Sequence, residues 1–191
     1  MGIFSKDTIL FKKQLSNLKK IQNLAVCGMF IALYIVLSYF NIKITVNIEI
    51  RFAFLVLAMS GCYGGPVMGL IVGAASDVLS MLMTSGQGSA FFFGFTVSYA
   101  LLGFLFGLCF YKNKISPVSV GVAAIFNFIV GTTLNTVWLY MMYGMPLKAL
   151  AVTRLIKEAV MLPLNFVMVF IVLRVLVQVV AKAGFMEVRS A

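Results

Sequence analysis

Residues 21–40 read IQNLAVCGMFIALYIVLSYF and contain no charged side chain. A run of about 20 apolar residues is long enough to cross the hydrocarbon core of a bilayer as a helix. The run is too long for the apolar region of a signal peptide, and no small-x-small cleavage motif follows it. It is therefore predicted to be a membrane span.

The composition extends this prediction to the whole chain. Of the 191 residues, 62% are hydrophobic and 10% are charged, whereas soluble globular domains average about 45–50% and about 25%. Too few polar side chains are present to cover a water-exposed surface. A soluble protein is excluded, and the lipid bilayer is the expected environment of most of the surface.

The span criterion, repeated along the chain, predicts an all-α membrane protein with a six-transmembrane-helix bundle. The predicted spans are residues 21–40, 52–63, 66–83, 92–111, 117–141 and 154–176. Residues 1–20 are basic, with apolar side chains at near-helical spacing, and are expected to form an interfacial helix or a disordered tail. Residues 21–191 are expected to form one membrane domain.

The basic residues indicate the orientation of this bundle. Most of them lie on the side of residues 1–20, which also holds Lys112, Lys114, Lys182 and Arg189. The opposite side holds fewer, namely Lys43, Arg51, Lys148 and Arg154. The positive-inside rule therefore predicts cytoplasmic N and C termini. The net charge of +10 then reflects topology, and no nucleic acid partner is predicted.

Polar residues within the spans concentrate in the half predicted to face outside. One face of the fifth span carries Asn127, Gly131, Asn135 and Trp138, and one face of the sixth carries Arg154, Glu158, Met161 and Asn165, with Lys157 beside it. Because the residues of each set are three or four apart, their side chains should lie on one side of the helix. We expect a cavity that opens to the outside above an apolar floor, with a kink at Pro163 that widens it.

The side chains at this cavity suit a ligand that is both aromatic and anionic. Arg154 and Lys157 are suited to carboxylates, and Phe95, Tyr99 and Trp138 are suited to rings. Two structural explanations remain open. Arg154 and Glu158 can form an ion pair at the interface while Lys157 extends to headgroups, and the aromatic residues can belong to an interfacial belt.

Motifs for catalysis and ATP hydrolysis are absent from the sequence. There is no phosphate-binding G-x-x-x-x-G-K-[ST] loop, no G-x-S-x-G and no H-E-x-x-H. The chain has no His, and Cys27, Cys62 and Cys109 lie singly in apolar runs, as packing residues do. No enzyme, cofactor or metal site is predicted, and any energy source is external. The lack of internal repeats disfavours a secondary transporter.

Three stretches of the chain resemble the substrate-binding S component of energy-coupling factor (ECF) vitamin transporters, and within them the folate-specific subfamily. They are FFFGFTVS at residues 91–98, GFLFG at 103–107 followed by Tyr111-Lys112, and Arg154-x-x-Lys157-Glu158 with Pro163 beyond it. Phe93 departs from the proline common in that family. The pair Gly28 and Ala32 resembles the family's contact for its transmembrane coupling subunit.

The resemblance implies that a bacterial plasma-membrane subunit captures folate from outside and reorients on a coupling subunit with two ATPase subunits. Arg154, Lys157 and Arg51 would then hold the glutamate carboxylates, and Phe95, Tyr99 and Trp138 would pack on the rings. Polar ring contacts are expected from Thr96, Asn127 and Asn135, and Glu158 completes the expected site. The alternatives are an S component for another vitamin or precursor, a non-transporting membrane scaffold, and secondary permeation by this chain alone.

Overall fold

The computed structural model describes residues 21–45, 48–84, 92–111, 113, 115–144 and 147–182. The predicted basic segment 1–20 lies outside these residues. The helices are α2 (Ile21–Tyr39), α3 (Phe54–Gly64), α4 (Pro66–Thr84), α5 (Phe93–Phe110), α6 (Pro117–Thr132), α7 (Leu134–Tyr143) and α8 (Leu147–Lys182). Five helical segments of the described chain are long and apolar enough to cross a membrane, with α6 and α7 counted as one, and α3 is a shorter apolar helix. The prediction of a helical membrane bundle is confirmed.

The last two predicted spans differ in detail from the structure. The fifth is broken at Thr133, where the backbone separates α6 from α7 and the hydroxyl of Thr133 donates to the carbonyl of Ile129. The sixth is longer at both ends than residues 154–176, because α8 extends over 36 residues. At 1.5 Å per residue such a helix is about 54 Å long, so it exceeds the thickness of the hydrocarbon core. Arg154 therefore lies two turns inside the helix.

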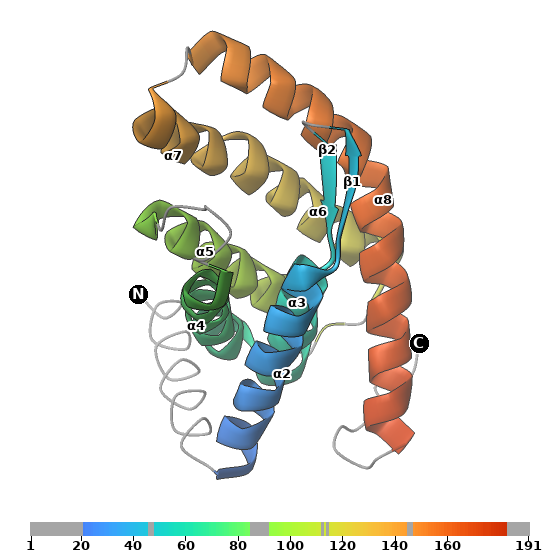
Figure 1. Ribbon diagram of the computed structural model, residues 1–191. Helices are drawn as coiled ribbons and strands as arrows, with labels where there is room; N and C mark the ends of the chain where they lie inside the picture. The colour runs from blue at the N-terminus through green and yellow to red at the C-terminus, as the bar shows by residue number, and fades with distance from the viewer. Residues whose placement is uncertain are drawn as a thin grey trace, which may run out of the picture.

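An antiparallel hairpin between α2 and α3 is an addition to the predicted bundle. Its strands are β1 (Asn41–Thr45) and β2 (Ile48–Arg51), and the backbone register sets Lys43 opposite Glu49 and Ile42 opposite Ile50. Figure 1 shows the hairpin extending from the end of α2, away from the beginning of that helix. The side chain of Arg51, a predicted site residue, lies outside what the structure describes.

Helices α3, α4 and α5 pack closely in the centre of the bundle because glycines remove side chains from their interfaces. A Cβ atom on Gly103 would collide with the backbone carbonyl of Gly69, and one on Gly61 would lie 2.7 Å from the backbone nitrogen of Gly107. Gly65, with a φ of 86°, forms the turn into Pro66 at the start of α4. These are internal contacts, as small residues four apart often provide in membrane helices.

The second half of the chain forms a separate layer against this centre. Helix α6 packs along α8 and against α5, and α7 contacts α5, α6 and α8. In Figure 1 the beginning of α2 and the end of α8 lie at the same end of the bundle, as an even number of crossings requires. Figure 1 also shows α8 bent along its length, which Pro163 inside the helix explains because it removes one backbone hydrogen bond.

The bundle has an outer half and an inner half. The outer half lies on the side of the hairpin and includes the ends of α2, α4 and α7 and the beginnings of α5 and α8. The inner half holds the α3–α4 turn, the end of α5 and the beginning of α6. The side chains exposed around both halves are largely apolar, as contact with lipid tails requires.

Candidate functional site

The seam between α6 and α8 brings together the two polar faces that the sequence predicted to converge. A Cβ on Gly131 of α6 would lie 2.8 Å from the carboxyl carbon of Glu158 on α8, so the two helices touch at this point. Asn135 lies four residues further along the chain, near the beginning of α7, which also contacts α8. The glycine allows the Glu158 carboxylate to lie against the backbone of α6.

The turn of α8 that carries Arg154, Lys157 and Glu158, here called the cationic turn, is partly enclosed. The side chains of Arg154, Lys157 and Glu158 all have intermediate exposure, whereas Leu155 and Ile156 between them are more than half exposed. The charged residues therefore face the bundle, and the apolar residues of the same turn face the surroundings. A cationic turn that is withdrawn from the bulk in this way can bind an anion without competition from the full solvent.

Three polar atoms near this seam are buried without a hydrogen-bond partner. They are Oγ1 of Thr132, Oδ1 of Asn135 and Oδ1 of Asn165. An unsatisfied buried acceptor costs about 1–3 kcal/mol. Polar groups placed at such a cost commonly contact a ligand or water, so the seam is the strongest candidate for a binding site among the described residues.

An aromatic cluster, defined as Phe92, Phe95 and Trp138, closes the outer end of the neighbouring α5–α7 interface. The ring centroid of Phe92 lies 5.9 Å from that of Trp138 and 6.1 Å from that of Phe95. The indole N–H of Trp138 donates to Oγ of Ser98 over 2.9 Å. A Cβ on Gly94 would lie 2.5 Å from an indole carbon, so the glycine makes room for the tryptophan.

Two predicted ring contacts have partners on neighbouring helices. The hydroxyl of Thr96 donates to Oδ2 of Asp77 on α4 over 2.7 Å, in a buried position. The ring of Tyr99 packs edge-on against Tyr34 of α2, with centroids 6.2 Å apart. Thr96 and Asp77 therefore join α4 to α5.

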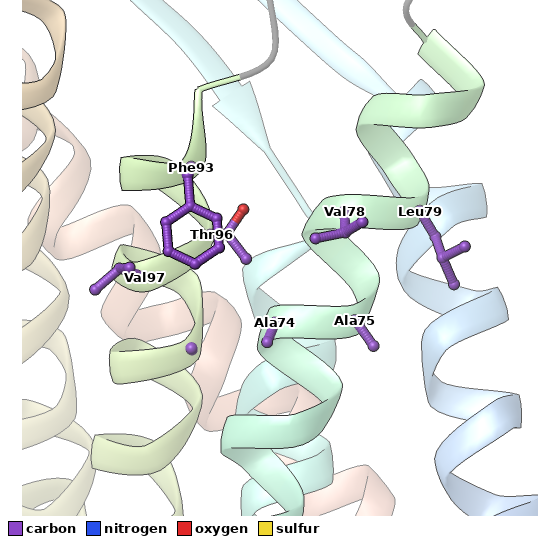
Figure 2. A pocket seen from close by; sticks show the side chains of 8 residues that line it. Ala74, Ala75, Val78, Leu79, Phe93, Thr96 and Val97 are labelled. Carbon is purple, nitrogen blue, oxygen red and sulfur yellow. The ribbon is translucent and has the colours of Figure 1, made fainter.

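A groove of about 470 Å³ lies between α4 and α5 but does not coincide with the polar seam. Figure 2 shows its lining, which consists of Ala74, Ala75, Val78, Leu79, Phe93, Thr96, Val97 and Ala100. Phe93 and Val97 are exposed on the outer surface of the bundle, where the surroundings are lipid. The groove contains no cation, so it does not suit an anionic ligand.

The remaining predictions concern one position on α6 and two on α2. Asn127 lies on α6 one turn inward of Gly131 and has intermediate exposure. Gly28 and Ala32 lie on the exposed face of α2, and a Cβ on Gly28 would meet nothing within 4 Å. In the described residues no three His, Cys, Asp or Glu side chains are grouped to hold a metal ion.

Several residues that shape this region were not among the predicted site residues. Ser98 and Gly94 position Trp138, and Phe92 belongs to the aromatic cluster. The signal for Gly94 was a glycine at the start of an otherwise bulky apolar helix. Arg174 was also overlooked in the charge distribution, and its guanidinium lies 4.3 Å from the ring centroid of Phe170 in the inner half of α8.

The sequence was compared with protein-family models and with known proteins. Residues 22–173 match the family model described as "ECF transporter, substrate-specific component". The folate transporter FolT of Clostridium novyi (strain NT) is 38% identical over 154 residues, which cover 80% of this chain and 88% of that protein. The folate transporter FolT of Leuconostoc mesenteroides subsp. mesenteroides is 28% identical over 146 residues, or 72% of this chain and 77% of that protein.

A solved structure agrees with these sequence relatives. The crystal structure of FolT bound with folic acid superimposes with a TM-score of 0.71 at 30% identity and covers 78% of this chain and 91% of that one. The shared fold, the length of the matched region and the level of identity lead to one assignment. This chain belongs to the family of substrate-specific components of ECF transporters.

Proposed function

We propose that this chain captures folate from the outside of a bacterial plasma membrane and delivers it through an ECF coupling module. The observation that carries the proposal is the seam in which the cationic turn of α8 faces the polar side of α6 and α7. The names of the relatives, two folate transporters and a FolT bound with folic acid, agree with it.

The chemistry of the seam matches the two ends of folate. Folate carries a glutamate with two carboxylates at one end and a fused heterocycle at the other. Arg154 and Lys157, with Arg51 from the hairpin, are proposed to hold the carboxylates through charge-assisted hydrogen bonds. Phe95, Tyr99 and Trp138 supply aromatic surface for the rings.

The remaining residues of the proposed site are assigned by their positions. Asn127 and Asn135 offer carboxamides to the polar edges of the ligand. Glu158 lies against Gly131 and orients the cationic turn. Thr96 lies at the margin of the site, where its hydroxyl donates a hydrogen bond to the carboxylate of Asp77.

Delivery to the cytoplasm is proposed to require partners. The transmembrane coupling subunit would dock on the exposed face of α2 around Gly28 and Ala32, where the structure leaves space. Two ATPase subunits would supply the energy, because the sequence has no phosphate-binding loop. The bundle would then reorient as one body, since its inner half is packed through glycine contacts.

Binding of folate to the purified full chain tests the proposal directly. Trp138 is the only tryptophan, so quenching of its fluorescence reports the aromatic cluster, and calorimetry provides an independent readout. Saturable binding at micromolar folate, with no competition from biotin, supports the proposal. Tight binding of another vitamin without binding of folate would reassign the substrate, and folate uptake into liposomes that contain this chain alone would favour secondary permeation.

A further inference from the structure

Gly131 of α6 is the position where a charged side chain of α8 lies against the helix backbone. A Cβ atom on Gly131 would lie 2.8 Å from the carboxyl carbon of Glu158, 2.9 Å from its Oε1 and 3.1 Å from its Oε2. The whole carboxylate group therefore rests on this glycine, in a contact that we call the carboxylate seat. A residue with a side chain at position 131 would occupy the space that the carboxylate now fills.

The α6–α8 interface is less tight at the other glycine of α6. A Cβ on Gly121 would lie 3.9 Å from the ring of Phe166, which is an ordinary van der Waals distance. Gly121 can therefore accept a methyl group in place, whereas Gly131 can accept one only if Glu158 moves. The end of a glutamate side chain moves by a change of rotamer, so Gly131→Ala should displace the carboxylate and leave the two helices in place.

The surroundings of Glu158 determine where a displaced carboxylate would go. Ile156 and Val160, on the outward side of this part of α8, are more than half exposed toward lipid, where a charge is costly. Arg154 lies one turn before Glu158 on the same face of the helix, and Lys157 is its neighbour in the chain. The displaced carboxylate would therefore move onto the cationic turn.

We propose that Gly131 is a positioning residue for anion binding. The carboxylate seat holds the negative charge of Glu158 away from the place where the glutamate carboxylates of folate bind Arg154 and Lys157. This proposal rests on the proposed function and adds to it a determinant of charge specificity. Two cations match the two ligand carboxylates only while the carboxylate of the protein is held aside, because on the cationic turn it would repel the ligand.

A double-mutant cycle on the purified full chain, with folate affinity measured by calorimetry, tests the proposal. Gly131→Ala should weaken folate binding at least about tenfold, because it moves a negative charge next to the ligand carboxylates. In a Glu158→Gln background the displaced group has the same size but no charge, so Gly131→Ala should change the affinity by less than about threefold. Gly121→Ala is the matched control on the same helix and should leave folate affinity unchanged.

Two results of this cycle would overturn the proposal. Unchanged folate affinity in Gly131→Ala would show that the carboxylate seat has no role in binding. An equal loss of affinity in both backgrounds would show that Gly131 serves only helix packing, since the charge at position 158 would then make no difference. Failure of the unmodified protein to bind folate would instead refute the proposed function.

If Gly131→Ala does not fold, Glu158→Asp provides the second measurement. Its side chain is shorter by one methylene group, so its carboxylate falls short of Gly131 and stays beside Arg154 and Lys157. Glu158→Asp should therefore bind folate about tenfold more weakly than Glu158→Gln, which carries no charge at this position. Equal folate affinity of the two variants would contradict the proposal.

Discussion

The outer and inner halves of the bundle are held together by different contacts. In the outer half single side-chain hydrogen bonds join neighbouring helices, namely Ser80 to Ser38, Thr96 to Asp77 and Trp138 to Ser98. In the inner half the backbones themselves touch, at Gly61 with Gly107, Gly69 with Gly103 and Gly107 with Pro66.

This difference indicates which half can respond to a ligand. Hydrogen bonds between side chains can be exchanged for bonds to a ligand at little net cost. Backbone contacts through glycine can separate only if the packed interface opens, and packed interiors resist gradual deformation. The outer half is therefore suited to binding, and the inner half is suited to moving as a rigid unit.

The largest expected effect comes from disrupting the inner half. In Gly103→Val the new side chain collides with the carbonyl of Gly69, so α4 and α5 must separate. We expect a loss of about 3 kcal/mol or more in stability, seen as aggregation during detergent chromatography. A variant that elutes and melts like the parent protein would contradict the rigid inner half.

A substitution in the outer half should act on binding instead. Arg154→Ala should weaken folate binding by about 1.5–3 kcal/mol, as for a hydrogen bond to a charged group, with limited change in the melting temperature of the ligand-free protein. Calorimetry and thermal melts measure the two quantities. Unfolding of the variant in detergent would favour the scaffold alternative, in which the polar cluster only locks the helices together.

The hydrogen bond between Thr96 and Asp77 tests whether a contact in the outer half stabilises the fold or binds the ligand. Thr96→Val leaves the buried carboxylate of Asp77 without its hydroxyl donor, so stability should fall by about 1–3 kcal/mol. Thr96→Ser retains the hydroxyl and should retain most of the stability. Thermal melts check both variants. If Thr96→Val lowers folate affinity at unchanged stability, the hydroxyl contacts the ligand, as the sequence predicted.

The smallest effect on the isolated chain is expected at Gly28. A Cβ at this position would meet nothing within 4 Å, so Gly28→Val should change stability and folate affinity by less than about 0.5 kcal/mol. Folate uptake by cells that also express the coupling module should nevertheless decrease, because the side chain enters the proposed docking face. Normal uptake would remove Gly28 from that face.

The membrane spans and the polar faces of the helices could be predicted from the sequence, because both follow from the spacing of residues along the chain. Span positions follow from apolar runs, and the contact of Gly131 with Glu158 joins two faces chosen by spacing alone. The hairpin was missed although its signal is present, since Ile42, Ile44, Ile48 and Ile50 alternate with polar residues. The stretch lies between the predicted spans 21–40 and 52–63, and the search for long apolar runs assigned it no element.

Other features could not be obtained from one sequence. The direction of the Thr96 hydroxyl depends on where Asp77 lies in space, and these residues are far apart in the chain. At the break at Thr133 the hydroxyl and the backbone N–H of Thr133 both donate to the carbonyl of Ile129, a local arrangement that the apolar pattern does not encode. The length of α8 depends on packing beyond the apolar core of the span.

Accessibility of the seam from the two sides of the membrane tests the central claim most directly. Cys27, Cys62 and Cys109 are replaced first, and Asn135→Cys is then introduced into the chain reconstituted without partners. A membrane-impermeant thiol reagent applied from the outside should label this position, and folate should protect it. Labelling only from the cytoplasmic side would contradict a binding seam that opens outward.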